Sequence, residues 1–286
     1  MSTTTLSNRI SDTTARRGRE GHTPPSPVRL RRFASLRMQS HVFFGNRTLL
    51  LNLAAGLLAM TGLVAAVAFS VTNSFRSGHP LDDPAFVQDI AVFGFPFAQI
   101  FLGVVAILFI CSEWSSGFIY TTHSAIQRPL SFVVAKTIWP ALTCAVGTVA
   151  MMVVVVPLES WLLAGTPYSI LLLDAAVWRQ IAALAFVTMS AVSFAAGIAL
   201  ILRNSATALG LYIRIILIAP IIIGQIPVDT AREIAKWLPN NVFNFLTTNA
   251  PNVTATLNYP LLIATAIAYP LAILTIGFLR LRRRVI

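Results

Sequence analysis

The charged residues of this chain are spaced so far apart that several stretches between them are long enough to cross a bilayer. Uncharged runs of 28, 23, 22 and 23 residues extend over 48–75, 90–112, 137–158 and 180–202. A helix of about 20 apolar residues spans the hydrocarbon core of a membrane. Charged residues make up only 11% of the chain, against about 25% in an average soluble domain. The spacing therefore predicts a polytopic membrane protein and excludes a soluble globular fold.

Two further spans are predicted in the C-terminal part, where the pattern is less regular. Residues 204–228 are long enough but contain Arg214, and 237–279 is an uncharged run whose first half is polar and turn-rich. Ser160–Leu173 is apolar but too short to cross, and is predicted to lie at the membrane interface. The predicted fold is all-α with six transmembrane helices over 49–70, 91–111, 137–157, 180–202, 207–228 and 259–279.

The basic residues predict the orientation of these helices. With both termini in the cytosol, 17 of the 21 lysine and arginine residues lie on the cytosolic side, nine of them within the first 47 positions. Only four would face outward: Arg76, Arg179, Arg232 and Lys236. An excess of cytosolic basic residues is the rule for membrane proteins. We therefore predict a multi-pass protein of a bacterial cell (plasma) membrane with cytosolic N- and C-termini. The net charge of +11 is attributed to this topology rather than to nucleic-acid binding.

The chain is predicted to have three parts. Residues 1–27 are rich in Ser, Thr, Pro and Arg, have no apolar core of a signal peptide, and predict a disordered cytosolic tail. Residues 28–47 predict an amphipathic interfacial helix on the cytosolic surface, with a plain basic anchor as the alternative. Five apolar residues can share one face of this helix: Leu30, Phe33, Leu36, Phe43 and Phe44. Three polar residues point away from that face: Arg31, Arg32 and Gln39. Residues 48–286 are predicted to form a six-helix transmembrane domain.

Sequence motifs for catalysis or for a cofactor are absent. The chain has no G-x-x-x-x-G-K-[ST] phosphate loop, no H-E-x-x-H and no G-x-S-x-G. Cys111 and Cys144 fall in or beside apolar stretches and are interpreted as small core residues, and the four histidines show no ligand spacing. The chain is therefore predicted not to be an enzyme, and no metal or cofactor is expected.

The most informative stretch follows the second predicted span. It reads Glu113-Trp114-Ser115-Ser116-Gly117-Phe118-Ile119-Tyr120-Thr121-Thr122, then Arg128-Pro129, then Ala135-Lys136. An acidic residue, an aromatic, a glycine four positions after the acid, Ile and Thr, a proline and Ala-Lys in this order resemble the permease subunits of ABC-2 type ABC transporters. The segment follows the second of six helices in that family, as it does here. One departure is that Arg128 precedes the proline, whereas a basic residue is expected after it.

The resemblance implies a permease subunit that has no motor of its own, in an ATP-driven exporter. Two such chains, identical or different, would pair in the membrane lipids, and two separate ABC ATPase subunits would dock beneath them. The coupling loop implied by the resemblance begins at Glu113 and ends at Thr122, with Arg128 and Lys136 beyond it. Four of its residues form an apolar-aromatic patch typical of interface cores: Trp114, Phe118, Ile119 and Tyr120. This composition favours docking, and an aromatic belt at the membrane interface is the alternative. In that loop the resemblance also includes Gly117 and Thr121.

Two other classes of function stay open. An ion-gradient-driven secondary transporter is the first, although the sequence has no internal repeat and no acidic residue at mid-membrane. A non-transporting membrane immunity or anchoring subunit is the second.

Arg214 is the one charge well inside a predicted span. Its side chain can reach the cytosolic headgroups, or it can face a substrate path. In the fourth span, Ser193 and Gly197 have the small-xxx-small spacing that favours close helix packing.

Overall fold

The computed structural model describes residues 34–79, 84–115, 129–166, 174–249 and 258–282, which after Ala34 belong to one compact unit. All regular structure in these ranges is helical. Six segments are long and apolar enough to cross a membrane: Arg47–Arg76, Ile90–Trp114, Val133–Leu162, Ala175–Leu202, Ser205–Gly224 and Tyr259–Leu281. The predicted all-α fold with six spans is confirmed.

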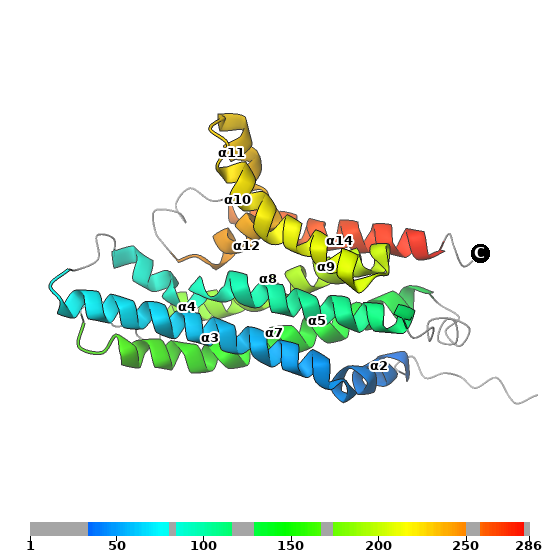
Figure 1. The fold of residues 1–286 in the computed structure, drawn as a ribbon, viewed down its shortest axis with the longest axis horizontal. Helices are drawn as coiled ribbons and strands as arrows, with labels where there is room; N and C mark the ends of the chain where they lie inside the picture. Colours follow the sequence, from blue (N-terminus) through cyan, green and yellow to red (C-terminus); the bar gives the residue numbers. More distant parts are fainter. Residues whose placement is uncertain (1–33, 80–83, 116–128, 167–173, 250–257, 283–286) are drawn as a thin grey trace, which may run out of the picture. The chain divides into compact units, whose positions relative to one another are not determined.

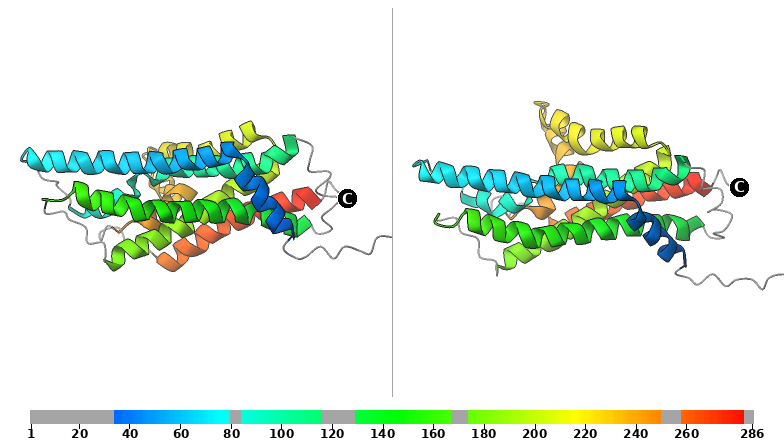
Figure 2. Two further views of the ribbon diagram at one scale, coloured as in Figure 1. Left: turned by 90° about the horizontal axis from the view of Figure 1, so that it is seen from below. Right: turned by 60° about the horizontal axis from the view of Figure 1, so that its bottom comes forward.

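The long helices lie alongside one another, roughly along the horizontal axis of the view (Figure 1). Their order is α2 (Ala34–Gly45), α3 (Arg47–Arg76), the 3-10 helix η1 (Pro84–Asp89), α4 (Ile90–Phe93), α5 (Phe95–Ser115), α7 (Pro129–Leu162), α8 (Ala175–Leu202), α9 (Ser205–Ile213), the π-helix η2 (Arg214–Ile218), α10 (Ala219–Gly224), α11 (Asp229–Lys236), α12 (Pro239–Thr247) and α14 (Tyr259–Arg282). The end of α5, the start of α7 and the end of α14 lie at the same end of the bundle as α2 (Figures 1 and 2). We call this the α2 end, and the opposite one the far end.

Capping residues explain where several spans begin. The Asn46 side chain accepts the N–H of Thr48 at 3.0 Å at the start of α3, and Asp174 accepts the N–H of Ala176 at 3.1 Å at the start of α8. Asn and Asp are preferred at such positions because they satisfy amides that have no partner within the helix. The capped start makes α8 longer than predicted, since its first turn precedes the uncharged run, whereas α3 begins only one residue before its run.

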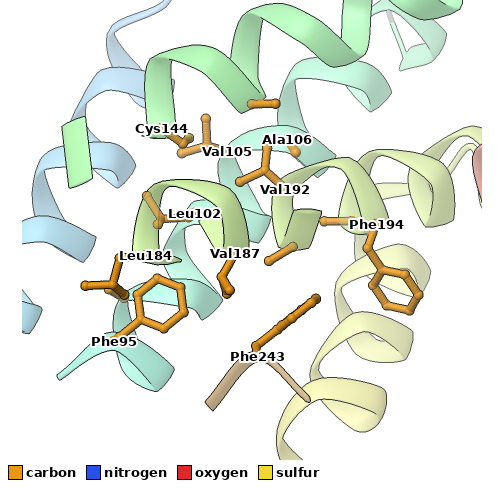
Figure 3. Packing of buried hydrophobic residues seen from close by; sticks show 14 of the residues in the cluster. Phe95, Leu102, Val105, Ala106, Cys144, Leu184, Val187, Val192, Phe194 and Phe243 are labelled. Carbon is orange, nitrogen blue, oxygen red and sulfur yellow. The ribbon is translucent and has the colours of Figure 1, made fainter. Parts of the chain in front are cut away.

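Helix α8 is the centre of the bundle. It packs against α5, α7 and α14, and 72% of the residues in its most apolar window are buried, compared with 22% in the fifth and sixth spans. Figure 3 shows Leu184, Val187 and Val192 of α8 among side chains of the neighbouring helices. The other spans therefore leave more of their apolar surface to lipid, and α8 leaves little.

A close approach of α8 and α14 depends on Gly197. A Cβ added there would lie 2.6 Å from Cγ2 of Ile273 and 3.0 Å from the backbone nitrogen of Leu274. About two turns earlier in α8, the Ser190 hydroxyl donates to the carbonyl oxygen of Ala266 in α14. Small residues let helix backbones approach in membranes. Close packing at Gly197, as expected from the small-xxx-small spacing, is confirmed.

The fifth span differs from the prediction. It ends at Gly224 rather than at 228, and its continuous helix is interrupted by η2, whose last residues precede Pro220. A proline inside a helix removes a hydrogen bond and collides with the carbonyl four residues earlier, and a π-turn accommodates this. Figures 1 and 2 show α10 and α11 leaning away from the other helices.

Two helices were missed in the segment after the fifth span. Helix α11 follows directly, and α12 occupies part of the region predicted to be turn-rich. Pro239 is the first residue of α12, where the missing N–H costs nothing. Proline and asparagine were interpreted as breakers of helices, whereas here Pro239 starts one.

Replacing Gly197 by alanine is expected to destabilise the protein by about 1–3 kcal/mol, because the added methyl collides with Cγ2 of Ile273 and lies tightly against the backbone nitrogen of Leu274. The matched control is Gly62→Ala in α3, since a Cβ there meets nothing within 4 Å. The thermal unfolding midpoint in detergent should fall for the first variant only. Equal midpoints for the two variants would show that α8 and α14 are not held this closely.

Candidate functional site

A buried ion pair joins α5 to α7 at the α2 end. The Lys136 ammonium lies 2.8 Å from Oε1 of Glu113, and the two side chains are only 1% and 10% exposed. The ammonium also donates to the carbonyl oxygen of Phe109 at 3.3 Å and lies 4.7 Å from the centre of its ring. These contacts compensate the charges for the loss of water. Because residues 116–128 separate the two helices, the pair connects both sides of that segment.

Helix α2 packs on this pair. The Gln39 amide donates to Oε1 of Glu113 at 3.3 Å, and the Phe43 ring meets the Phe109 ring edge-on with centroids 5.2 Å apart. We call Gln39, Phe43, Phe109, Glu113 and Lys136 the ion-pair cluster. It holds α2 against α5 and α7.

The prediction for the face of α2 is partly wrong. Gln39 was placed away from the apolar face, but it is buried together with Phe43 one helical turn later, whereas Phe44 is half exposed. The reason is that the Glu113 carboxylate accepts a hydrogen bond from the Gln39 amide, which a lipid surface would not do. A helix before the first span is present over 34–45, and residues 28–33 lie outside the described ranges.

Trp114 lies on another side of the last turn of α5. The Arg203 guanidinium is 4.3 Å from the centre of its indole, within the range of a cation–π contact. Arg203 connects α8 to α9 and has φ of 59°, a left-handed conformation that is unusual for a residue other than glycine. Trp114, Arg203, Asn46 and Asn204 line a cavity of about 440 Å³. Trp114 therefore contacts the α8–α9 connection.

Glu113 and Trp114 were predicted to belong to a water-facing loop. Both belong to the last turn of α5, with Glu113 buried and Trp114 half-buried. The remaining predicted loop residues lie outside the described ranges: Gly117, Phe118, Ile119, Tyr120, Thr121 and Arg128. The structure thus brings together Glu113 and Lys136 from the predicted set, with Trp114 beside them.

Arg214 is separate from the ion-pair cluster. It is the first residue of η2 and its side chain is exposed on the surface of the fifth span. A charge facing lipid is costly unless it reaches water or a partner. Two roles therefore stay open for Arg214: its side chain can reach the cytosolic headgroups, or it can face a substrate path.

Glu159 is a second buried acid, and sequence reasoning missed its position. It lies just beyond the predicted span 137–157, yet its side chain is 0% exposed in the last turn of α7. Among the described residues, neither carboxyl oxygen has a hydrogen-bond partner. The apolar run that precedes Glu159, together with Trp161 and Leu162 after it, was the available signal that the helix continues past this residue.

At the far end, Asp89 holds the connection after α12. Its carboxylate accepts the backbone N–H of Asn249 at 2.6 Å, the hydroxyl of Thr248, and the Gln180 amide at 3.4 Å. Gln180 also donates to the carbonyl oxygen of Thr247 at 3.2 Å. Helices α12 and α8 are thereby fixed to the start of α4.

The described ranges contain no group of three His, Cys, Asp or Glu side chains that could hold a metal ion. No protein-family model matches the chain, and no curated protein shows significant similarity to it. The ion-pair cluster joins α2, α5 and α7 at the α2 end of the bundle.

Removing one partner of the buried pair should be costly. Lys136→Met leaves the Glu113 carboxylate buried without its cation, and we expect a loss of about 3–5 kcal/mol. The double variant Glu113→Gln/Lys136→Met should be more stable than Lys136→Met alone, because no unpaired charge is left. Thermal unfolding of each purified variant measures these differences.

The control is the exposed pair of Lys236 and Glu233, whose side chains are 56% and 65% exposed. Lys236→Met should change stability by less than about 1 kcal/mol, since exposed pairs contribute little. If Lys136→Met proves as harmless as Lys236→Met, Glu113 and Lys136 do not form a buried pair.

Proposed function

We propose that this chain is the membrane-spanning permease subunit of an ABC-2 type exporter driven by a separate ABC ATPase. The observation that carries the proposal is the buried Glu113–Lys136 pair, which joins the two helices on either side of residues 116–128 and connects them to α2. An ATPase pressing on that segment would move three helices at once. Coupling of ATP hydrolysis to a movement in the membrane requires that the helices contacted by the ATPase move as one rigid unit.

The arrangement of helices also supports this function. A helix precedes the first span, six spans follow, and a long segment with α11 and α12 separates the fifth span from the sixth. The six spans agree with the six helices of the family that the chain resembles, in which the Glu113 segment also follows the second helix. The lack of a phosphate loop in the chain is consistent with a motor on another subunit. A second permease chain, identical or different, would complete the transporter.

In this proposal the α2 end faces the cytosol. The orientation rests on the basic residues, which are concentrated toward that end. The ATPase would then reach the segment between α5 and α7, and the far end would face outward.

Single-cysteine labelling tests this orientation. Ser77→Cys, at the exposed end of α3, should react with a membrane-impermeant maleimide in intact cells, whereas His41→Cys in α2 should react only after lysis. Cys111 and Cys144 are buried, so the wild-type background should be low. Labelling of His41→Cys in intact cells would reverse the proposed orientation.

The proposed function predicts that the chain co-purifies with an ATPase that contains a phosphate loop. Trp114→Ala should weaken that association about thirtyfold, if the indole contributes about 2 kcal/mol at the interface. The matched control is Trp161→Ala, since Trp161 is 73% exposed on α7 toward the far end. Association is measured by pull-down at equal membrane abundance.

A further variant separates docking from packing. Arg203→Ala removes the cation–π contact but leaves the indole, so it should retain more ATPase than Trp114→Ala. Equal losses for the two variants would assign Trp114 to the α8–α9 connection instead.

The ion-gradient-driven transporter is the second candidate, and Glu159 is the observation in its favour. A buried carboxyl without a hydrogen-bond partner among the described residues is a plausible carrier of a proton or cation in a membrane protein. Purification of the intact chain from its native membrane with no ATPase bound, under conditions that preserve other transporter complexes, would contradict the first proposal and favour this one.

A further inference from the structure

A pocket at the far end combines an apolar body with a polar mouth. It lies between α8, α12 and α14 and has a volume of about 580 Å³. Ala183 and Phe186 of α8 and Ile263 of α14 line its apolar part, and Arg179, Asn249 and Tyr259 line its polar part. This pocket is distinct from the ion-pair cluster, which lies at the α2 end.

The polarity of the pocket changes along the axis of the bundle. Arg179 is in the second turn of α8, and Phe186 is seven residues further toward the α2 end, which corresponds to about 10 Å along a helix. Tyr259 likewise begins α14, and Ile263 is one turn deeper. The polar groups therefore lie at the end of the spans and the apolar groups toward their middle, as in a phospholipid of the adjacent leaflet.

Exposed tryptophans mark the level of the polar mouth. Trp178, next to Arg179, is 58% exposed. Tryptophans at the ends of membrane helices lie at the level of the lipid headgroups. The guanidinium of Arg179 is thus placed where a headgroup phosphate lies.

Arg179 keeps the capacity to bind an anion. One terminal nitrogen, Nη2, donates to the carbonyl oxygen of Thr248 and to Oδ1 of Asn249, and Nη1 donates to the hydroxyl of Tyr259 at 3.4 Å. A guanidinium has five N–H donors, so two are left by these contacts. In the part of the chain that the structure describes, no carboxylate forms an ion pair with Arg179.

The pocket is open toward the bilayer. Its wall on α14 is formed partly by Ile263, which is 42% exposed, and Leu261 and Ile267 of the same helix are exposed as well. An acyl chain can therefore enter sideways from the lipid. A soluble anion would have no use for the apolar part, which makes up most of the lining.

We propose that this pocket binds an anionic phospholipid, with its phosphate on Arg179 and one acyl chain between α8 and α14. Basic pockets between membrane helices bind anionic headgroups in this way. The lipid would hold α12 and α14 together at the far end, because Arg179 already contacts the residues that connect them. The proposal does not depend on an ATPase or on the direction of transport.

Binding is tested with the full-length chain purified in a mild detergent. Phosphatidylglycerol and phosphatidylcholine with identical acyl chains are added, and bound lipid is counted by native mass spectrometry. The wild-type chain should bind phosphatidylglycerol about tenfold more tightly, because phosphatidylcholine carries the same phosphate but its choline cation offsets that charge beside the Arg179 guanidinium. Arg179→Gln should abolish this preference, whereas Arg76→Gln, an exposed arginine at the same end of α3, should retain it.

Two further measurements address the acyl chain and the fold. Ala183→Leu fills the apolar part of the pocket and leaves Arg179 intact. It should weaken the binding of both lipids by the same factor. Arg179→Lys keeps the positive charge and should retain part of the preference, even if Arg179→Gln proves too unstable to purify. Soluble glycerol phosphate should not compete with phosphatidylglycerol.

Three results would overturn the proposal. The first is equal binding of the two lipids by the wild-type chain. The second is an unchanged preference in both Arg179 variants. The third is full competition by glycerol phosphate, which would assign the site to a free anion. None of these results bears on ATPase association, so the proposed function is tested by separate experiments.

Discussion

Backbone hydrogen bonds must be satisfied without water wherever this chain crosses lipid, and every other feature is arranged around that constraint. Helices satisfy it within each segment. The hydroxyls inside the spans follow the same rule, since Thr61, Thr137, Thr148 and Thr275 each donate to the carbonyl four residues earlier in their own helix. Several hydroxyls in the spans thus bond within their own helix. Contact between the spans depends mainly on apolar packing around α8, with a few polar bonds such as those from Ser190 to Ala266 and from Tyr212 to Gln99.

Strong polar contacts between helices are therefore found near the two ends of the bundle. At the α2 end, Glu113 and Lys136 join α5 to α7 and to α2. At the far end, Asp89 joins α4 to α8 and to the residues after α12. Charged pairs near the interface avoid the full desolvation cost of the bilayer centre. These contacts fix the ends of the helices, and apolar packing is the main contact between the middle parts of the spans.

Charge spacing was sufficient to predict the number and type of the spans, because the length of an uncharged run directly limits what can cross a membrane. Local signals were weaker where tertiary contacts decide. Gln39 could not be placed correctly without knowing that Glu113 lies opposite, 74 residues away. Glu159 was misplaced because a carboxylate normally marks the end of a span, and Pro239 because it can either stop or start a helix. For the site, the sequence pointed to Glu113 and Lys136 separately, and only the fold brings them into one pair.

The π-turn from Arg214 to Ile218 determines how the second half of the fifth span is rotated. A π-turn holds one more residue than an α-turn, and one residue corresponds to about 100° of rotation around a helix axis. The face of α10 is therefore turned by roughly that angle relative to an uninterrupted helix continuing from α9. The single extra residue in this turn therefore decides which residues of α10 face lipid or a second chain.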